Sequence, residues 1–308
     1  RHSKLGLRLY AIGSDALALA PMTDRLSYLE DGDVVRVTRQ SVEIFDHEGR
    51  RASRPVTQVA LDATRIEKAG YKHFMAKEIA EQPVVIADAL KHYAGTSGSL
   101  NLPQGLDFTD VDRITLVACG TASYACHVAK YWFEQVAGLP ADIDIASEFR
   151  YREPVLSPAS MAIFVSQSGE TADTLAALRH VKDKVARVVS VVNVPTSSIA
   201  RESDLALPIL AGVEVGVAST KAFTCQLTTL ALMALKAAQD RGRISATDLA
   251  QKLETLRALP GLINAALALS DPIARIAKDL AKAQDILFLG RGSMYPLALE
   301  GALKLKEI

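Results

Sequence analysis

The run Ser166-Gln167-Ser168-Gly169-Glu170-Thr171 places three hydroxyl side chains directly after an apolar segment. The apolar residues before it predict a buried strand, and the residues after it predict a helix. The hydroxyls therefore fall at a helix N-terminus, where unpaired N–H groups and about half a positive charge favour an anion. Gly169 lets a backbone N–H approach such a ligand closely. This pattern predicts a site for a phosphate monoester.

Helix capping is the alternative explanation, because serine and threonine are preferred caps and need no ligand. Two further loops of the same kind favour the ligand: Cys119-Gly120-Thr121-Ala122-Ser123, and the stretch from Val217 through Ser219 to Thr220. Ligands of open parallel sheets bind outside the C-terminal ends of the strands, where the helices begin. Three such loops on one sheet predict a pocket for a small polyhydroxylated phosphate.

Nucleotides and cofactors fit the sequence poorly. The hydroxyl run lacks the lysine of a GxxxxGK[ST] loop, which disfavours a nucleoside triphosphate. Gly290-Arg291-Gly292-Ser293-Met294-Tyr295 lacks the third glycine of a dinucleotide fingerprint. Cys119, Cys126 and Cys225 form neither a CxxC pair nor a ligand cluster, which is typical of a reducing compartment. We expect no cofactor, no metal and a cytoplasmic protein.

The elements that must position these loops alternate between strand and helix, which predicts an α/β fold with a doubly wound parallel sheet and helices on both faces. The expected strands are 114–118, 143–146, 161–165, 188–192 and 205–209. A long helix is expected at 220–239, and two further helical stretches at 246–269 and 271–283.

Residues 286–289 restart the strand, glycine and hydroxyl pattern, followed by a helix that continues to the last residues. We interpret this as the opening of a duplicate of the first unit, truncated in this sequence. The front of the chain is different. Short β-branched runs at 25–29, 34–38 and 41–46 predict strands, and a helical period spans 71–93 with a break or a new start at Pro83.

The expected domain organisation has five parts. The first is a β-rich segment too small to be a domain alone; the fourth consists of connecting helices and the fifth opens the duplicate. Their boundaries are 1–60, 61–105 (linker and helices), 106–245, 246–283 and 284–308.

Bulk composition excludes two classes of partner. Lys plus Arg and Asp plus Glu each total 35, so no basic excess indicates a nucleic-acid-binding protein. No apolar run reaches the roughly 18 residues of a membrane span, and no signal-peptide pattern opens the chain.

Several stretches together resemble the isomerase half of the glutamine:fructose-6-phosphate aminotransferase family. The run 166–174 alone resembles only the broader sugar isomerase (SIS) fold; the combination is specific. The stretches are 118–121, 146–151, 166–174, 216–224 and 298–307. Residues 14–19 and 28–33 are similar to the tail of that family's N-terminal-nucleophile glutaminase domain, and 73–83 to the joining segment, whereas 1–13 look shortened.

The resemblance implies an enzyme that hydrolyses glutamine in one domain, passes ammonia internally, and converts fructose 6-phosphate to glucosamine 6-phosphate in the other. It also implies a homodimer. The implied phosphate ligands are Ser166, Gln167, Ser168 and Thr171. The implied sugar-site residues are Gly120, Thr121, Val217 and Ser219. Glu307 is implied as the base that moves a proton between C1 and C2, with Lys304 one turn earlier assisting.

The sequence departs from the family at several places. Ala122 stands where many members have serine. Nothing matches the glutaminase cysteine, the ring-opening histidine or the Schiff-base lysine, so we expect no glutamine turnover by this sequence alone.

Purely structural roles, without any part in catalysis or binding, remain open for several residues. Lys304 and Glu307 fit an exposed i,i+3 ion pair. Cys119 fits a packing residue at the pocket edge, and His127 and Trp132 fit core or interface positions. Two other functions also remain: a sugar-phosphate-sensing SIS module without catalysis, and a glutamine-independent SIS isomerase or deglycase.

Overall fold

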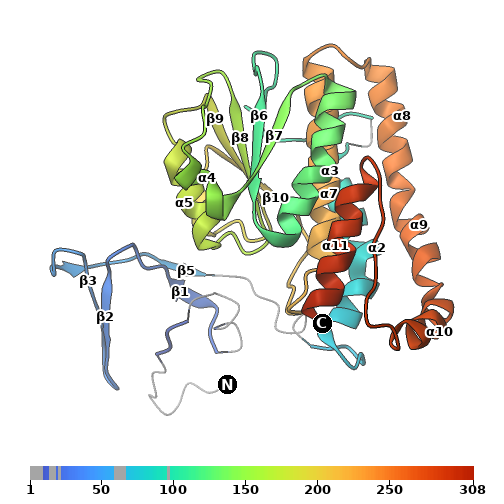
Figure 1. Ribbon diagram of the computed structural model, residues 1–308. Coiled ribbons are helices and arrows are strands. Elements are labelled where there is room, and N and C mark those ends of the chain that lie inside the picture. The colour runs from blue at the N-terminus through green and yellow to red at the C-terminus, as the bar shows by residue number, and fades with distance from the viewer. Residues whose placement is uncertain (1–9, 14–18, 20–21, 59–66, 96–97) are drawn as a thin grey trace. The chain divides into compact units, whose positions relative to one another are not determined.

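The computed structural model describes residues 10–13, 19, 22–58, 67–95 and 98–308 and divides the chain into two units, Arg1–Glu67 and Lys68–Ile308 (Figure 1). Most of the shortened stretch 1–13 and of the motif at 14–19 lies outside the described residues. Within the described ranges, no helix has the length and apolarity needed to cross a bilayer.

The first unit contains two small antiparallel sheets. β1 (Arg25–Ser27) pairs with β5 (Val56–Gln58), and β3 (Val42–Phe45) lies between β2 (Val34–Val37) and β4 (Arg51–Ala52). The three predicted strands are confirmed to within two residues at each end, and β4 and β5 were not foreseen. The Arg54 guanidinium donates two hydrogen bonds of 2.8 Å to Asp33 and lowers the pKa of that carboxyl to about 2.

The second unit is built on a five-stranded parallel sheet in the order β10-β9-β8-β6-β7. The strand bounds are β6 (Ile114–Ala118), β7 (Ala141–Ile145), β8 (Met161–Ser166), β9 (Arg187–Val192) and β10 (Leu205–Pro208). β6 and β8 are buried along their whole length, as expected for central strands covered on both faces. The five predicted strands are therefore confirmed.

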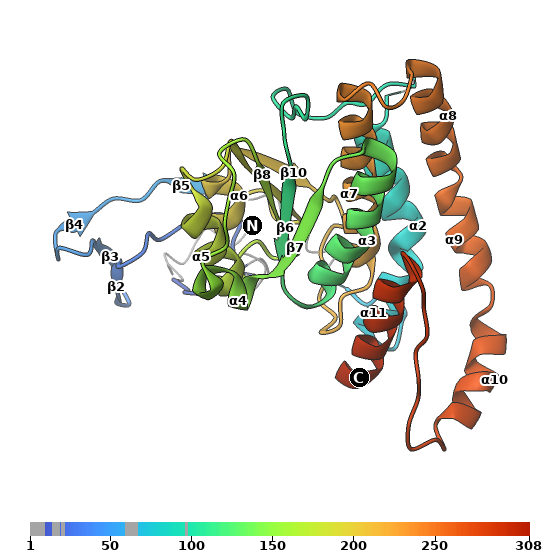
Figure 2. The ribbon, with the colours of Figure 1, turned by 45° about the horizontal axis from the view of Figure 1, so that its top comes forward.

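The strand order reverses between β6 and β8, and the helices that follow these two strands cover opposite faces of the sheet. α3 (Gly120–Ala137) contributes Ala125, Ala129 and Phe133 to the larger apolar core. α5 (Ala172–Val181), with the short α4 (Ala146–Arg152) and α6 (Ser198–Glu202), packs into a second core on the other face (Figure 2). A crevice opens at such a reversal, at the C-terminal ends of the strands, which is where ligands of this architecture bind.

α7 (Lys221–Asp240) is the central helix of the larger core. It packs between α3 and α2 (Phe74–Tyr93), and 14 of its side chains are buried, including the polar Lys221, Gln226, Thr228 and Thr229. A helix buried nearly all round belongs to the interior of its domain.

The predicted break at Pro83 is wrong, because α2 runs through it as one helix. Proline lacks the N–H that would bond to the carbonyl four residues earlier, which is that of Ile79. The Gln82 side chain donates to the Ile79 oxygen at 2.9 Å and replaces the missing partner. Because of this side-chain hydrogen bond, the Ile79 carbonyl has a donor although Pro83 cannot supply one.

The helices that follow α7 lie on the same side of the sheet as α3 and α2 (Figures 1 and 2). The predicted stretch 246–269 forms two helices, and the next prediction corresponds to α10. The bounds are α8 (Ala246–Arg257), α9 (Leu259–Leu267), α10 (Ser270–Leu280) and α11 (Met294–Glu307).

The strand predicted at 286–289 is wrong: these residues pair with no strand of the described structure. Leu287 and Leu289 are 85% and 89% exposed. An apolar run becomes a strand only where a neighbouring strand satisfies its N–H and C=O groups.

Candidate functional site

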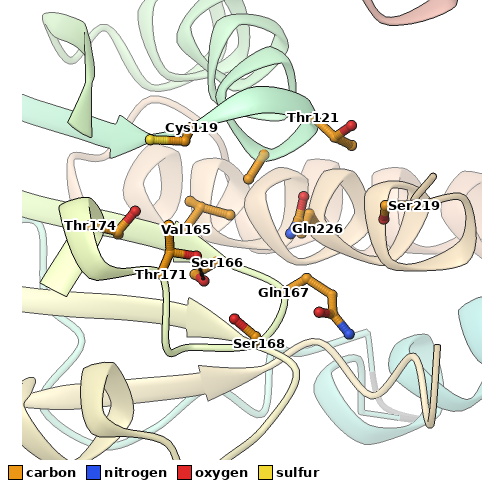
Figure 3. Close-up of a pocket in the computed structure, with 11 residues that line it drawn as sticks. Cys119, Thr121, Val165, Ser166, Gln167, Ser168, Thr171, Thr174, Ser219 and Gln226 are labelled. Carbon is orange, nitrogen blue, oxygen red and sulfur yellow. Dashed lines mark hydrogen bonds between the residues drawn. The ribbon is translucent and has the colours of Figure 1, made fainter. Parts of the chain in front are cut away.

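A cavity of about 180 Å³ lies at the C-terminal ends of β6 and β8, where the strand order reverses (Figure 3). Its wall combines hydroxyl, amide and small apolar side chains from the loops after both strands and from α7. The lining residues are Cys119, Thr121, Ala122, Val165, Ser166, Gln167, Ser168, Thr171, Thr174, Ser219 and Gln226.

The loop after β8 folds around the hydroxyl of Ser166, which is 3% exposed. Its Oγ accepts the Gly169 N–H at 3.0 Å and lies 3.1 Å from Thr171 Oγ1. Gly169 has φ +68°, and a Cβ there would come within 2.0 Å of Ser197 Oγ, so only glycine fits. The loop thus turns tightly and presents hydroxyl and N–H groups at the start of α5.

Helix capping does not account for the Thr171 hydroxyl, whereas Ser166 and Ser168 each accept a backbone N–H within the loop, from Gly169 and Glu170. In the described structure the N-cap residues of α3, α5 and α7, which are Cys119, Thr171 and Thr220, make no side-chain cap hydrogen bond. The N-termini of α3 and α5, which follow β6 and β8 at the cavity, therefore keep donors free for an anion.

α11 brings charged side chains to the opposite rim of the cavity. Lys304 Nζ donates to Thr121 Oγ1 at 2.9 Å and lies 3.2 Å from Glu300 Oε1, and the Thr121 hydroxyl donates to the same Glu300 oxygen at 3.2 Å. Glu300 is 6% exposed, and burial raises the pKa of its carboxyl against the opposing effect of Lys304. Thr121 is thereby fixed between a cation and a carboxylate.

The structure brings most of the predicted site residues together. Six of the eight predicted substrate-binding residues line the cavity: Thr121, Ser166, Gln167, Ser168, Thr171 and Ser219. Gly120 is exposed as the first residue of α3, and Val217 is 97% exposed on the loop before α7. Neither of them is among the lining residues.

The two predicted catalytic residues lie beside the cavity and not on its wall. Lys304 reaches the lining residue Thr121, and Glu307 Oε2 lies 3.5 Å from Lys304 Nζ. The Glu307 side chain is 40% exposed at the end of α11. This geometry fits a base at the rim and also the exposed ion pair.

Sequence reasoning gave no role to three polar residues at the site. Thr174 and Gln226 line the cavity and are each 1% exposed. Among the described residues, Thr174 Oγ1, Gln226 Oε1 and Glu300 Oε2 have no hydrogen-bond partner. The available signal was weak: Gln226 is an amide within a largely apolar helix, and Glu300 is four residues before Lys304 on the same helical face.

The structural roles expected for Cys119 and Trp132 are confirmed, and the core or interface role of His127 stays a prediction. Cys119 is partly buried, lines the cavity and packs against the smaller core. Trp132 packs against the larger core, and His127 Nδ1 lies 2.8 Å from the Ser123 carbonyl on its own helix.

The chain is similar to known proteins in both sequence and fold. A family model described as the SIS domain matches residues 107–236. A glutamine–fructose-6-phosphate aminotransferase (isomerizing) from Bradyrhizobium diazoefficiens is 53% identical over 300 residues, and its counterpart from Brucella abortus is 54% identical over 299. Both alignments cover 96% of this chain and 49% of the relative, so the chain spans about half the length of these curated relatives.

A solved structure is also similar to this chain, and the match covers a larger share of that protein than the sequence matches do of theirs. The C-terminal domain of glucosamine-fructose-6-phosphate aminotransferase from Francisella tularensis is 44% identical, with a TM-score of 0.75. The match covers 79% of this chain and 69% of that one. The chain therefore belongs to the glutamine–fructose-6-phosphate aminotransferase family and carries its SIS domain.

Proposed function

We propose that the protein converts fructose 6-phosphate and glutamine into glucosamine 6-phosphate and glutamate, and that this chain holds most of the sugar-phosphate site. The observation that carries the proposal is the cavity at the strand reversal, with anion donors on one side and the Thr121–Lys304–Glu300 contacts on the other. The names of the relatives at 53% and 44% identity support the choice of substrate.

The reaction balances without an added oxidant or cofactor. Water cleaves the glutamine side-chain amide and releases ammonia. Ammonia adds to the C2 carbonyl of fructose 6-phosphate, and one water leaves as the imine forms. A base then removes a C1 proton as the imine nitrogen takes up a proton, which gives an enaminol. C2 is then protonated, and the C1 hydroxyl loses its proton as it becomes the aldehyde. The water consumed equals the water released, so the net change is transfer of nitrogen with isomerisation.

Each predicted site residue has a proposed part in this chemistry. Ser166, Gln167, Ser168 and Thr171 bind the phosphate, together with the N-terminus of α5. Gly120, Thr121, Val217 and Ser219 contact the sugar. Glu307 is the proton carrier between C1 and C2, and Lys304 assists by holding positive charge next to it.

The remaining parts of the proposal concern regions around the site. The β-rich first unit is a remnant of a glutaminase domain, and glutamine is handled by residues beyond this sequence. Residues 284–308 open a second SIS unit. The protein is a cytoplasmic homodimer; its three cysteines, all free thiols here, suit a reducing compartment.

Equilibrium binding to the full-length protein tests the substrate assignment. Calorimetric titration is expected to show binding of fructose 6-phosphate. Fructose and inorganic phosphate should bind far more weakly, because each of them can make only part of the contacts. Equal binding of inorganic phosphate and fructose 6-phosphate would contradict a sugar site. Tight binding of fructose 6-phosphate without any amino-sugar product would instead favour a sensing module or a glutamine-independent isomerase.

Gln226 provides a prediction within this proposal. A buried amide oxygen without a partner costs about 1–3 kcal/mol, which a sugar hydroxyl can recover by donating to it. In Figure 3 its amide lies between Ser166 and Ser219. The Gln226→Met variant keeps the side-chain length and removes the acceptor, so we expect KM for fructose 6-phosphate to rise about fivefold.

The matched control is Gln239→Met, an exposed glutamine on the same helix, for which steady-state kinetics should show no change in KM. An unchanged KM in Gln226→Met would mean that water and not the sugar satisfies this oxygen.

A further inference from the structure

The loop 213–220, which precedes α7 and carries Val217 and Ser219, is held by a buried carboxylate from outside the cavity. Glu78 lies in the second turn of α2 and is 2% exposed. Its Oε1 accepts the Val215 N–H at 2.6 Å and the Gly216 N–H at 3.1 Å, and its Oε2 lies 3.2 Å from the Gly216 nitrogen. These contacts join positions about 137 residues apart in the chain.

Gly216 fits Glu78 closely. A Cβ on Gly216 would lie 2.5 Å from Glu78 Oε2 and 3.5 Å from the Met75 Cα. The first distance is a clash, and the second is ordinary contact. The absence of a side chain at 216 therefore serves the approach of the carboxylate.

The far end of the loop is held by a second carboxylate, Glu214. Its Oε1 accepts the N–H groups of Thr220 and Ala222 at 2.9 and 3.1 Å, which caps α7 where Thr220 itself does not. Its Oε2 accepts the Ser219 hydroxyl at 2.8 Å. The Ser219 hydroxyl has one proton, which it donates to Glu214. Toward a ligand in the cavity it therefore acts as a hydrogen-bond acceptor.

In the described structure, Glu78 and Glu214 bind the loop on both sides of Val217 and Ala218, which themselves contact neither carboxylate. Val217 is 97% exposed and Ala218 is buried, so the short span between the two anchors has little freedom. Ser219, which follows it, lines the cavity beside Gln226.

We infer that Glu78 is a positioning residue for the sugar-phosphate site: it fixes the loop 213–220 so that Ser219 faces the ligand as an acceptor. This inference rests on the proposed function. The inference gives α2 a role in positioning the site, although no residue of α2 lines the cavity.

The test is a double-mutant cycle in the full-length protein with Glu78→Ala and Gly216→Ala. Each single change should raise KM for fructose 6-phosphate about tenfold, because each releases or displaces the loop. In the Glu78→Ala background the added Cβ meets no carboxylate, so Gly216→Ala should cause little further change. Additive effects of the two substitutions would overturn the inference.

The control is Glu81→Gln, one turn further along α2. Glu81 pairs with the buried Lys221 at 2.7 Å and with Lys77 at 3.4 Å, and in the described part of the chain it accepts no hydrogen bond from the loop backbone. This variant should lower Tm and leave KM unchanged. If Glu81→Gln and Glu78→Ala raise KM equally for the same loss of Tm, Glu78 acts only through stability and the inference fails.

Hydrogen exchange separates this inference from the proposed function. Peptides spanning 213–220 should lose protection in Glu78→Ala and keep it in Glu81→Gln, with no substrate present. Loss of protection with an unchanged KM would show that the loop is fixed by Glu78 but does not serve the sugar. If the wild-type protein binds no fructose 6-phosphate, the proposed function fails, and the inference fails with it.

Discussion

Replacing Ser166 by alanine is expected to weaken fructose 6-phosphate binding by about 10–100-fold. Two losses add in this variant. A hydrogen bond to a charged phosphate contributes about 1.5–3 kcal/mol, and the Ser166 oxygen also holds the Gly169 N–H and lies next to Thr171. Calorimetric titration of the full-length protein measures the change.

Ser190→Ala is the matched control for this variant. Ser190 is fully buried on the neighbouring strand β9 and lies outside the cavity wall. It should leave the affinity unchanged. A Ser166→Ala protein that binds fructose 6-phosphate like the wild type would show that the loop after β8 is only a helix start.

The Glu307→Gln variant is expected to lower kcat by about 10²–10⁴-fold, the usual contribution of a general base, with KM nearly unchanged. Glutamine keeps the shape of the side chain and cannot take up the C1 proton. Lys304 should stay in place, because it retains Thr121 at 2.9 Å and Glu300 at 3.2 Å. Steady-state kinetics with saturating glutamine measure both constants.

The control for Glu307→Gln is Glu254→Gln, which breaks an exposed ion pair with Arg257 on α8 and should not affect turnover. If Glu307→Gln retains kcat within about threefold of the wild type, the Lys304–Glu307 contact is the exposed ion pair that its spacing also allows.

The sequence predicts the parts of the site that follow one another along the chain. Ser166 to Thr171 come directly after a buried strand, and the same holds for Thr121, so both loops must meet at one edge of a parallel sheet. Strand bounds were also predictable from local sequence, because unbroken apolar runs such as 161–165 are typical of strands covered on both faces.

The rest of the site depends on contacts between distant segments, which local pattern does not encode. Glu78 reads as an ordinary acid on an amphipathic helix, yet it binds the backbone of residues 215 and 216. Gln226 and Glu300 become site residues only through the packing of α7 and α11 against α3. Two local rules also failed, at Pro83, where Gln82 compensates, and at 286–289, which no strand of the described residues joins.

The most direct test of the account is the reaction itself, run with the full-length protein, fructose 6-phosphate and glutamine labelled with ¹⁵N in the side-chain amide. The account predicts glucosamine 6-phosphate that carries the label, formed in equal amount with glutamate. Mass spectrometry measures both products. Fructose 6-phosphate that is bound or isomerised without incorporation of the label would contradict the account.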